Sequence, residues 1–176
     1  MDSLVNYLIM KQSIIDKAKK VKLLLTDCDG VLTDGGVYYS NNGEEMKRFS
    51  LRDGMGTERL RKLVKVDTGI VTGESSIITR RRATKLEIIE IYTNIKDKVK
   101  CVKEICEKHN LDLSEIAYIG DDTNDLGIMK LVGLSACPND AISFVKDVAN
   151  YITEAKGGNG AYREFAELII DAKLNH

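Results

Sequence analysis

Short apolar runs alternate along the chain with stretches that carry a helical pattern of apolar and polar positions. In the clearest helical stretch, Lys96–His109, apolar residues such as Val102 and Ile105 share one face and charged residues occupy the other. The strand-like runs are Val21–Thr26, Thr68–Thr72, Ile88–Thr93, Ile116–Gly120, Leu134–Ala136 and, more weakly, Ala149–Thr153. This alternation predicts an α/β fold, a doubly wound, Rossmann-like parallel sheet with helices on both faces.

One segment after the first strand-like run departs from the alternation. Two β-rich runs, Val37–Tyr39 and Met46–Phe49, flank Asn41–Gly43, a sequence typical of a tight turn. We therefore expect a β-hairpin flap at this point of the chain.

The first twenty residues are predicted to form an N-terminal helical extension, residues 1–20, followed by a single domain, residues 21–176. The apolar positions that fit a helical stripe are Leu4, Val5, Leu8, Ile9, Ile14, Ile15 and Ala18. Polar residues such as Asp2 and Asn6 interrupt them, so the segment lacks the continuous apolar block of a signal peptide.

Composition narrows the possible partners and ligands. The formal net charge is -1 and no window approaches a transmembrane helix, so neither nucleic acid nor a membrane is expected as a partner. The four cysteines lack the short paired spacings of zinc sites. Four thiols in a chain without a secretory signal favour a reducing cytoplasm. Only His109 and His176 are present, so a multi-histidine metal site is excluded from this chain alone. Any metal ion must be held by oxygen.

Charged and hydroxyl side chains follow four of the predicted strands. Asp27 and Asp29 come directly after the first strand, and Thr72 ends the second. Lys98 follows the third strand, and the acidic segment Gly120–Asp125 follows the fourth. Because the carboxyl ends of parallel strands share one edge of the sheet, we expect these side chains to converge there.

These residue types suit phosphate chemistry assisted by a hard cation. Carboxylates clustered without histidine or thiolate are ligands for Mg²⁺, which commonly binds together with phosphate oxygens. Thr72 and Lys98 can donate to those oxygens. A cation also accounts for the neighbouring Asp27 and Asp29, since each carboxylate otherwise disfavours ionisation of the other.

The chain carries "DCDGV", "VTG", Lys98 and "GDDTND" in that order. The order is typical of the haloacid dehalogenase superfamily of phosphatases, which the chain resembles over about Leu23 to Asp125. The resemblance implies that Asp27 is the nucleophile, and that Asp29 protonates the leaving oxygen and later deprotonates water. It also implies that Thr72 and Lys98 bind the phosphoryl oxygens. The implied Mg²⁺ ligands are Asp27, the backbone carbonyl of Asp29 and Asp121, with Asp122 and Asp125 in support.

Further motifs resemble one branch of this superfamily, the phosphatases of 3-deoxy-ulosonic acid phosphates. The matching segments are "VYYSNNGEEMKRFSLRDGMG", "VTGESSIITRRRATKL" and "GGNGAYREFAELI". The resemblance implies a phosphomonoesterase without a cap domain, because the stretches between the motifs are too short to hold one. The implied substrate is 3-deoxy-D-manno-octulosonate 8-phosphate, with a nine-carbon ulosonate 9-phosphate as the alternative.

The same branch implies an oligomer and a set of substrate-binding residues. Arg82 and Lys85 match positions that face the sugar, and Glu74 can accept hydrogen bonds from its hydroxyls. Four subunits are expected to assemble through their hairpins into a homotetramer. Arg163 and the loop Lys156–Gly160 would then act on the site of a neighbouring subunit.

Two other classes of protein fit the sequence less well. A response-regulator receiver also combines a phosphorylated aspartate, an acidic pair, a threonine and a lysine, but it places the acidic pair after the first strand and the phosphorylated aspartate after the third. The "DCD" and "GDD" segments do not fit that order. A catalytically silent subunit is disfavoured because the full set of phosphatase residues is present.

Overall fold

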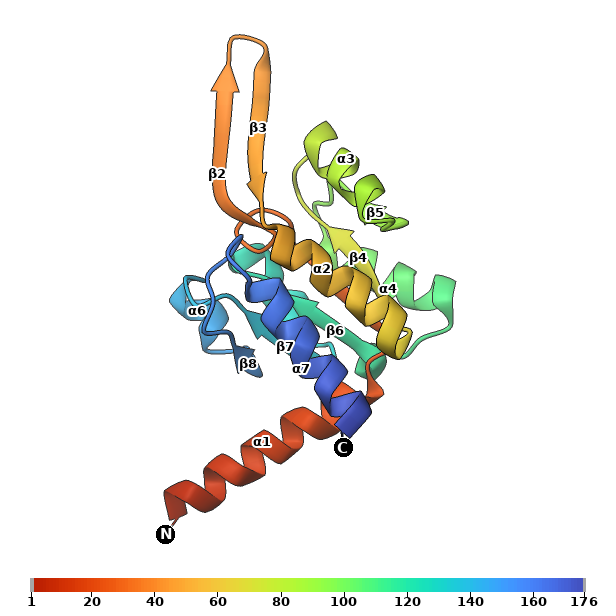
Figure 1. Cartoon of the computed structure of the whole chain (residues 1–176), viewed down its shortest axis with the longest axis vertical. Helices are drawn as coiled ribbons and strands as arrows, with labels where there is room; N and C mark the ends of the chain where they lie inside the picture. The colour runs from red at the N-terminus through yellow and green to blue at the C-terminus, as the bar shows by residue number, and fades with distance from the viewer. Residues whose placement is uncertain (1, 176) are drawn as a thin grey trace.

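The computed structural model describes residues 2–175, with side chains from residue 11 onward. At its centre lies a six-stranded, all-parallel sheet in the order β5-β4-β1-β6-β7-β8 (Figure 1). Its strands are β1 (Leu23–Thr26), β4 (Asp67–Val71), β5 (Glu90–Tyr92), β6 (Ile116–Ile119), β7 (Leu134–Cys137) and β8 (Tyr151–Ile152). Each strand falls within or overlaps a predicted run, and the predicted parallel sheet is confirmed.

Two apolar layers, one on each face of the sheet, hold the fold together. Successive side chains of a strand point to opposite faces, so Leu24 joins one layer while Leu23 and Leu25 join the other. The Leu24 layer is covered by α1 (Asp2–Lys20), α3 (Ile77–Lys85), α7 (Ala161–Asn175) and Leu60, which follows α2. Helix α2 (Leu51–Arg59) packs beside α7. The other layer is covered by α4 (Lys98–His109), α5 (Leu126–Met129) and α6 (Ser143–Lys146). Burial of Leu24 alone contributes about 2 kcal/mol, because it is fully buried.

Local signals explain where these helices begin and end. Ser50 caps α2 by accepting hydrogen bonds from the backbone of Arg52 and Asp53. A π-helical turn, Leu60–Val64, continues α2 and ends at Lys65, which has a left-handed φ of 57°. Short 3-10 turns lie at Leu113–Glu115 and Thr123–Asp125, immediately before β6 and α5 respectively.

A β-hairpin stands out from the body of the molecule (Figure 1). Its strands, β2 (Thr33–Ser40) and β3 (Gly43–Phe49), are antiparallel with two register irregularities. The predicted hairpin is therefore confirmed. From β3 the chain passes through α2 and its π-helical turn into β4, and the segment between β4 and β5 holds only α3, so the fold has no cap domain.

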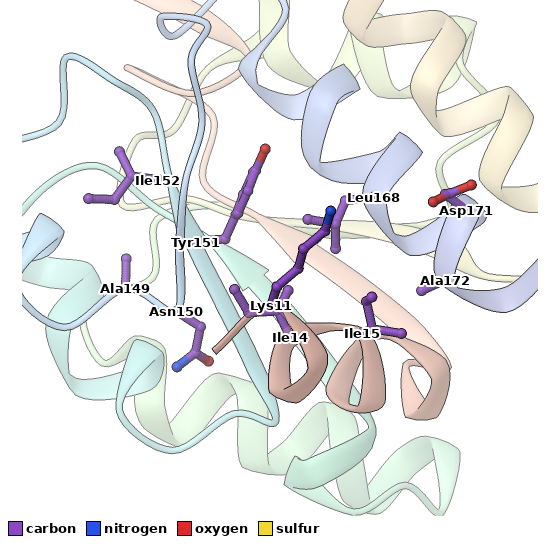
Figure 2. A pocket seen from close by; sticks show the side chains of 10 residues that line it. All are labelled: Lys11, Ile14, Ile15, Ala149, Asn150, Tyr151, Ile152, Leu168, Asp171 and Ala172. Atoms are coloured by element: carbon purple, nitrogen blue, oxygen red, sulfur yellow. The ribbon is translucent and has the colours of Figure 1, made fainter. Parts of the chain in front are cut away.

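Helix α1 projects from the opposite end of the molecule and contacts α7 through its second half (Figure 1). The apolar stripe predicted at residues 4–9 lies outside the described side chains. Beside α1 lies an apolar hollow of about 650 Å³ whose lining includes Ile14, Tyr151 and Leu168 (Figure 2). Within residues 2–175, no helix has the length and apolarity needed to cross a membrane.

Candidate active site

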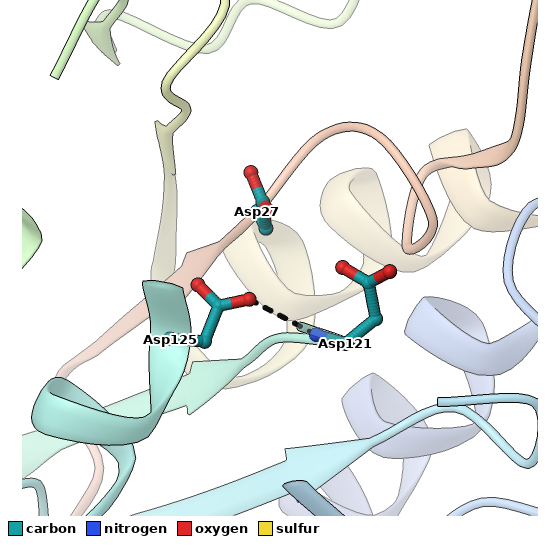
Figure 3. Close-up of side chains that lie close together, drawn as sticks. All are labelled: Asp27, Asp121 and Asp125. Carbon is teal, nitrogen blue, oxygen red and sulfur yellow. Dashed lines mark hydrogen bonds between the residues drawn. The ribbon is translucent and has the colours of Figure 1, made fainter. Parts of the chain in front are cut away.

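Three aspartates meet at the carboxyl edge of the sheet (Figure 3). Strands β1 and β6 are neighbours in register, with Thr26 opposite Ile119, so the residues that follow each strand lie side by side. Asp27 comes from β1, whereas Asp121 and Asp125 come from the loop after β6. One carboxylate oxygen from each of the three lies within 4.8 Å of the others.

Lys98 lies against this cluster from the first residue of α4. Its Nζ is 2.9 Å from Asp27 Oδ2 and 2.7 Å from Asp125 Oδ1. Burial would lower the pKa of Lys98, but the two adjacent carboxylates raise it above its ordinary value. The ammonium is therefore charged and fixed beside Asp27.

Asp125 is held by several hydrogen bonds, whereas Asp121 has an oxygen without a partner in the described part of the chain. Asp125 Oδ1 accepts from Lys98 and from the Tyr118 hydroxyl at 2.6 Å, and its Oδ2 accepts from the backbone N–H of Asp121 and Asp122. Its oxygens are thus fully engaged. Oδ1 of Asp121 is buried yet has no hydrogen-bond partner among the described residues.

The donor set fits a divalent cation with a preference for oxygen. Burial, followed by the nearby Asp125 carboxylate, raises the pKa of Asp27 to about 6 despite Lys98. Burial and the neighbouring Asp27 raise the pKa of Asp121 to about 8. The raised pKa values of Asp27 and Asp121 mean that ionisation of these two carboxylates is favoured by positive charge beyond that of Lys98, and a bound cation supplies it. Asp27 and Asp121 have the side-chain oxygens to hold such an ion.

Gly30 makes room for Asp121. It has a φ of +84°, and a Cβ built there would stand 2.0 Å from Asp121 Oδ2. The glycine of the "DCDG" motif therefore serves both the left-handed turn and the close approach of this carboxylate.

Cys28 contributes to the site through its backbone N–H and not through its thiol. The Cys28 N–H donates to Asp27 Oδ1 at 2.7 Å, which orients the carboxylate. Burial raises the pKa of the Cys28 thiol to about 12, so it is not a competing thiolate nucleophile.

Asp29 is held by residues of the hairpin. Lys47 Nζ lies 2.8 Å from Asp29 Oδ2, and the Thr33 hydroxyl donates to Asp29 Oδ1 at 3.3 Å. Lys47 was not predicted from the sequence, because a lysine in a hairpin usually points into solvent. Its side chain is only 1% exposed.

The remaining motif residues occupy two kinds of position. Thr72 is buried at the end of β4, where its N–H donates to the carbonyl of Tyr92 and its hydroxyl accepts from the N–H of Glu74. Asp122 is exposed and caps the following turn by accepting from the N–H of Thr123. Asp122 is therefore adjacent to the acidic cluster in sequence, but its described side-chain hydrogen bond lies within its own turn.

The expected substrate-binding residues do not join the acidic cluster within one chain. Glu74 and Lys85 are exposed. Arg82 donates to the carbonyl of Ser50 and lies over the Phe49 ring, 5.7 Å from its centroid. Among the described contacts, none of these three side chains bonds to Asp27, Asp29 or Asp121.

The expected tail residues also make contacts within their own chain. Arg163 pairs with Glu167 at 2.6 Å, and its backbone N–H donates to Asp53. The glycine-rich loop packs on the backbone that follows the "DCD" motif, with Gly158 N–H donating to the carbonyl of Val31 at 2.8 Å. The loop therefore braces the catalytic edge of its own subunit.

Comparison with known proteins identifies the family. Residues 56–165 match the model of the haloacid dehalogenase-like hydrolases. The 3-deoxy-D-manno-octulosonate 8-phosphate phosphatase of Escherichia coli strain K12 is 37% identical over 160 residues, which cover 91% of this chain and 85% of the relative.

Solved structures agree in fold and sequence. The crystal structure of the 3-deoxy-D-manno-octulosonate 8-phosphate phosphatase from Yersinia pestis matches with a TM-score of 0.88 and 38% identity, over 92% of this chain and 86% of that one. The Moraxella catarrhalis phosphatase, in complex with a magnesium ion, a phosphate ion and KDO, has a TM-score of 0.89 and 38% identity, covering 92% of each chain. The chain therefore belongs to the haloacid dehalogenase-like hydrolases and, within them, to the family of 3-deoxy-D-manno-octulosonate 8-phosphate phosphatases.

Proposed function

We propose that this protein is a Mg²⁺-dependent phosphomonoesterase that hydrolyses 3-deoxy-D-manno-octulosonate 8-phosphate. The observation that carries the proposal is the arrangement around Asp27. This carboxylate is oriented by the Cys28 N–H, paired with Lys98 and placed beside an unpartnered oxygen of Asp121. The magnesium, phosphate and sugar acid held by the Moraxella relative favour the same chemistry and the eight-carbon substrate.

The proposed reaction has two steps. An oxygen of Asp27 attacks phosphorus, the bond from phosphorus to the sugar oxygen breaks, and Asp29 gives that oxygen a proton. Water then attacks the phosphorus of the aspartyl phosphate and loses a proton to Asp29. The bond from phosphorus to Asp27 breaks, which releases inorganic phosphate and restores both carboxylates.

Other residues of the chain would stabilise the negative charge on the phosphoryl group. The buried ammonium of Lys98 and the hydroxyl of Thr72 lie at the carboxyl edge of the sheet and can face its oxygens. When bound by Asp27, Asp121 and the backbone carbonyl of Asp29, Mg²⁺ supplies further charge neutralisation. Asp125 would support the loop of this site, and Asp122 would cap the turn that follows Asp121.

We propose that four copies assemble through their hairpins. Without a cap domain the site lies open, and closing a site to water normally requires a second body. The hairpin carries Tyr38, Tyr39 and Met46, which are 63%, 69% and 59% exposed in the single chain, and such apolar groups are typical of an interface. In a tetramer, Arg163 and the loop Lys156–Gly160, while keeping the loop's contact with the edge of its own subunit, would also lie near a neighbouring site. Light scattering that gives a monomer under active conditions would remove this part of the proposal.

Glu74, Arg82 and Lys85 are proposed to contact the sugar acid in the assembled enzyme. Guanidinium and ammonium groups recognise carboxylates, and a ulosonate carries one far from its phosphate. Arg82 would have to leave its hydrogen bond to the carbonyl of Ser50, or keep it and bind the substrate with its other N–H groups. We place the enzyme in the cytoplasm, because its four cysteines are free and buried, as expected of a reducing compartment.

The deciding experiment measures phosphate release with Mg²⁺ from 3-deoxy-D-manno-octulosonate 8-phosphate, nine-carbon ulosonate 9-phosphates and simple sugar phosphates. We expect a kcat/KM for the eight-carbon acid that exceeds the others by orders of magnitude. The variant Asp27→Asn should keep the fold and lose turnover, since the amide is a poor nucleophile. Activity retained in a clean preparation of this variant would contradict the mechanism, and preference for a nine-carbon acid would contradict the substrate.

A further inference from the structure

A buried lysine joins the hairpin to the catalytic edge. Lys47 lies on β3, where its neighbours Met46 and Arg48 are exposed, yet its own side chain is 1% exposed. Its ammonium is 2.8 Å from Asp29 and 3.6 Å from Glu44. A buried ammonium is costly unless it is paired, and ordering a lysine side chain costs entropy as well. The position of Lys47 therefore depends on these two carboxylates.

The contact is part of a short chain of polar groups between the hairpin and the body. Glu44, also on the hairpin, accepts a hydrogen bond from Ser76, which caps α3. Lys47 lies between Glu44 and Asp29, and its Nζ is closer to the carboxylate of Asp29 than to that of Glu44. A displacement of the hairpin would therefore move the ammonium away from Asp29.

Both oxygens of Asp29 are held from the same part of the chain. Lys47 contacts Oδ2, and the hydroxyl of Thr33, at the start of β2, donates to Oδ1. The next residue is Gly30, whose left-handed φ of +84° lets the chain turn sharply. Without these two contacts the Asp29 side chain would be free to rotate about its own bonds.

We propose that Lys47 is a positioning residue of the phosphatase reaction, holding the Asp29 carboxylate where it exchanges protons with the leaving oxygen and with water. The inference rests on the proposed function of Asp29. It adds that the hairpin is part of the catalytic apparatus of its own subunit, because the placement of the hairpin fixes the acid–base group.

The two steps of the reaction separate this role from a structural one. An aryl phosphate such as p-nitrophenyl phosphate has a stable leaving group, so breaking its ester bond does not need a proton from Asp29. Attack of water on the aspartyl phosphate still needs Asp29 to accept a proton, whatever the substrate was. Loss of positioning should therefore slow the second step and leave the first nearly unchanged for this substrate.

The test compares Lys47→Met, Lys47→Arg and a control variant of the same strand in rapid-mixing experiments with p-nitrophenyl phosphate and Mg²⁺. The control is Glu45→Gln, because Glu45 is exposed and contacts Ser40 near the tip of the hairpin. For Lys47→Met we expect an initial burst of p-nitrophenol of about one equivalent per site, with acid-stable phosphoenzyme accumulating. A steady rate at least about tenfold below that of the unaltered protein should follow.

For Lys47→Arg we expect partial recovery of the steady rate, since the guanidinium keeps the charge beside Asp29. The control should match the unaltered protein. A Lys47→Met protein with an unchanged steady rate would overturn the inference. So would an equal loss in both steps without phosphoenzyme accumulation. If Lys47→Met does not fold, Lys47→Gln takes its place, and an unchanged second step in that variant would overturn the inference.

Failure of this inference can be told apart from failure of the proposed function. Unaltered protein that hydrolyses 3-deoxy-D-manno-octulosonate 8-phosphate, together with a fully active Lys47→Met variant, would overturn only the role of Lys47. Unaltered protein that releases phosphate from no ester and forms no phosphoenzyme would overturn the proposed function itself.

Discussion

Replacing Gly30 with alanine tests whether Asp121 binds the cation. The added Cβ would stand 2.0 Å from Asp121 Oδ2 and 2.5 Å from its Cγ. Carbon atoms normally approach other heavy atoms to about 3.5 Å, so the carboxylate would have to move by more than about 1 Å. Magnesium holds its oxygen ligands at about 2.0–2.1 Å with little tolerance, and a shift of this size removes a ligand.

The expected free energies have two separate sources. Alanine at a left-handed φ costs about 1–2 kcal/mol of stability with or without metal. Loss of an Asp121 contact should weaken Mg²⁺ binding at least about tenfold, or about 1.4 kcal/mol. At a magnesium concentration about 100 times the Kd of the unaltered protein, bound metal adds about 2.7 kcal/mol of stability. The Gly30→Ala protein should gain only about half of that.

Gly35→Ala is the matched control for this experiment. Gly35 has a similar φ of +76°, but a Cβ there would meet nothing nearer than 3.9 Å. The two variants therefore share the backbone cost, and only Gly30→Ala adds the clash with Asp121. The assay is urea denaturation with and without magnesium, supported by calorimetric titration of the metal. A Gly30→Ala protein that binds magnesium as tightly as Gly35→Ala would refute the placement of the ion at Asp121.

Three further outcomes are expected. Lys98→Met leaves Asp27 and Asp125 without their shared ammonium group, so in chelator the free energy of unfolding should fall by about 3 kcal/mol. Magnesium should then restore more stability than it does in the unaltered protein. Equal urea midpoints of the two proteins in chelator would contradict this expectation. Tyr118→Phe removes the 2.6 Å hydrogen bond to Asp125 and should cost about 1.5–3 kcal/mol in thermal or urea unfolding; an unchanged transition would show that the bond contributes nothing. Burial raises the pKa of Glu90, but the contacts with Lys108 and Tyr92 together have the larger effect, so the pKa lies below its ordinary value of 4.5. Its contribution is therefore complete above pH 4.5 and lost in more acidic solution, and the urea midpoint of Glu90→Gln should approach that of the unaltered protein as pH falls.

The sheet and the acidic cluster followed from the sequence because both depend on local patterns. Alternating β-rich and amphipathic segments determine a parallel sheet, and the carboxyl ends of β1 and β6 share one edge. The meeting of Asp27, Asp121 and Asp125 can therefore be predicted without any knowledge of side-chain packing. The hairpin was equally predictable, since its turn residues and its two β-rich runs lie within one short segment.

The residues that the sequence did not reveal depend on packing between distant segments. Lys47 turns inward on a hairpin with irregular register, and no period-two pattern shows which face such a residue takes. Tyr118 lies in a buried strand, where its ring resembles any core aromatic residue and only its hydroxyl contact to Asp125 marks it. Arg82 was predicted as a substrate-binding residue, but no local pattern of charges predicts its described contacts with Phe49 and with the carbonyl of Ser50.

The central sheet tapers toward both of its outer strands. At one border β5 contributes three residues and at the other β8 contributes two, whereas β4, beside the centre, has five. An outer strand leaves one row of N–H and C=O groups unpaired, and such a row is a template on which another chain can add a strand. Strands of two and three residues present so few of these groups that edge-to-edge growth of the sheet into aggregates has little to start from.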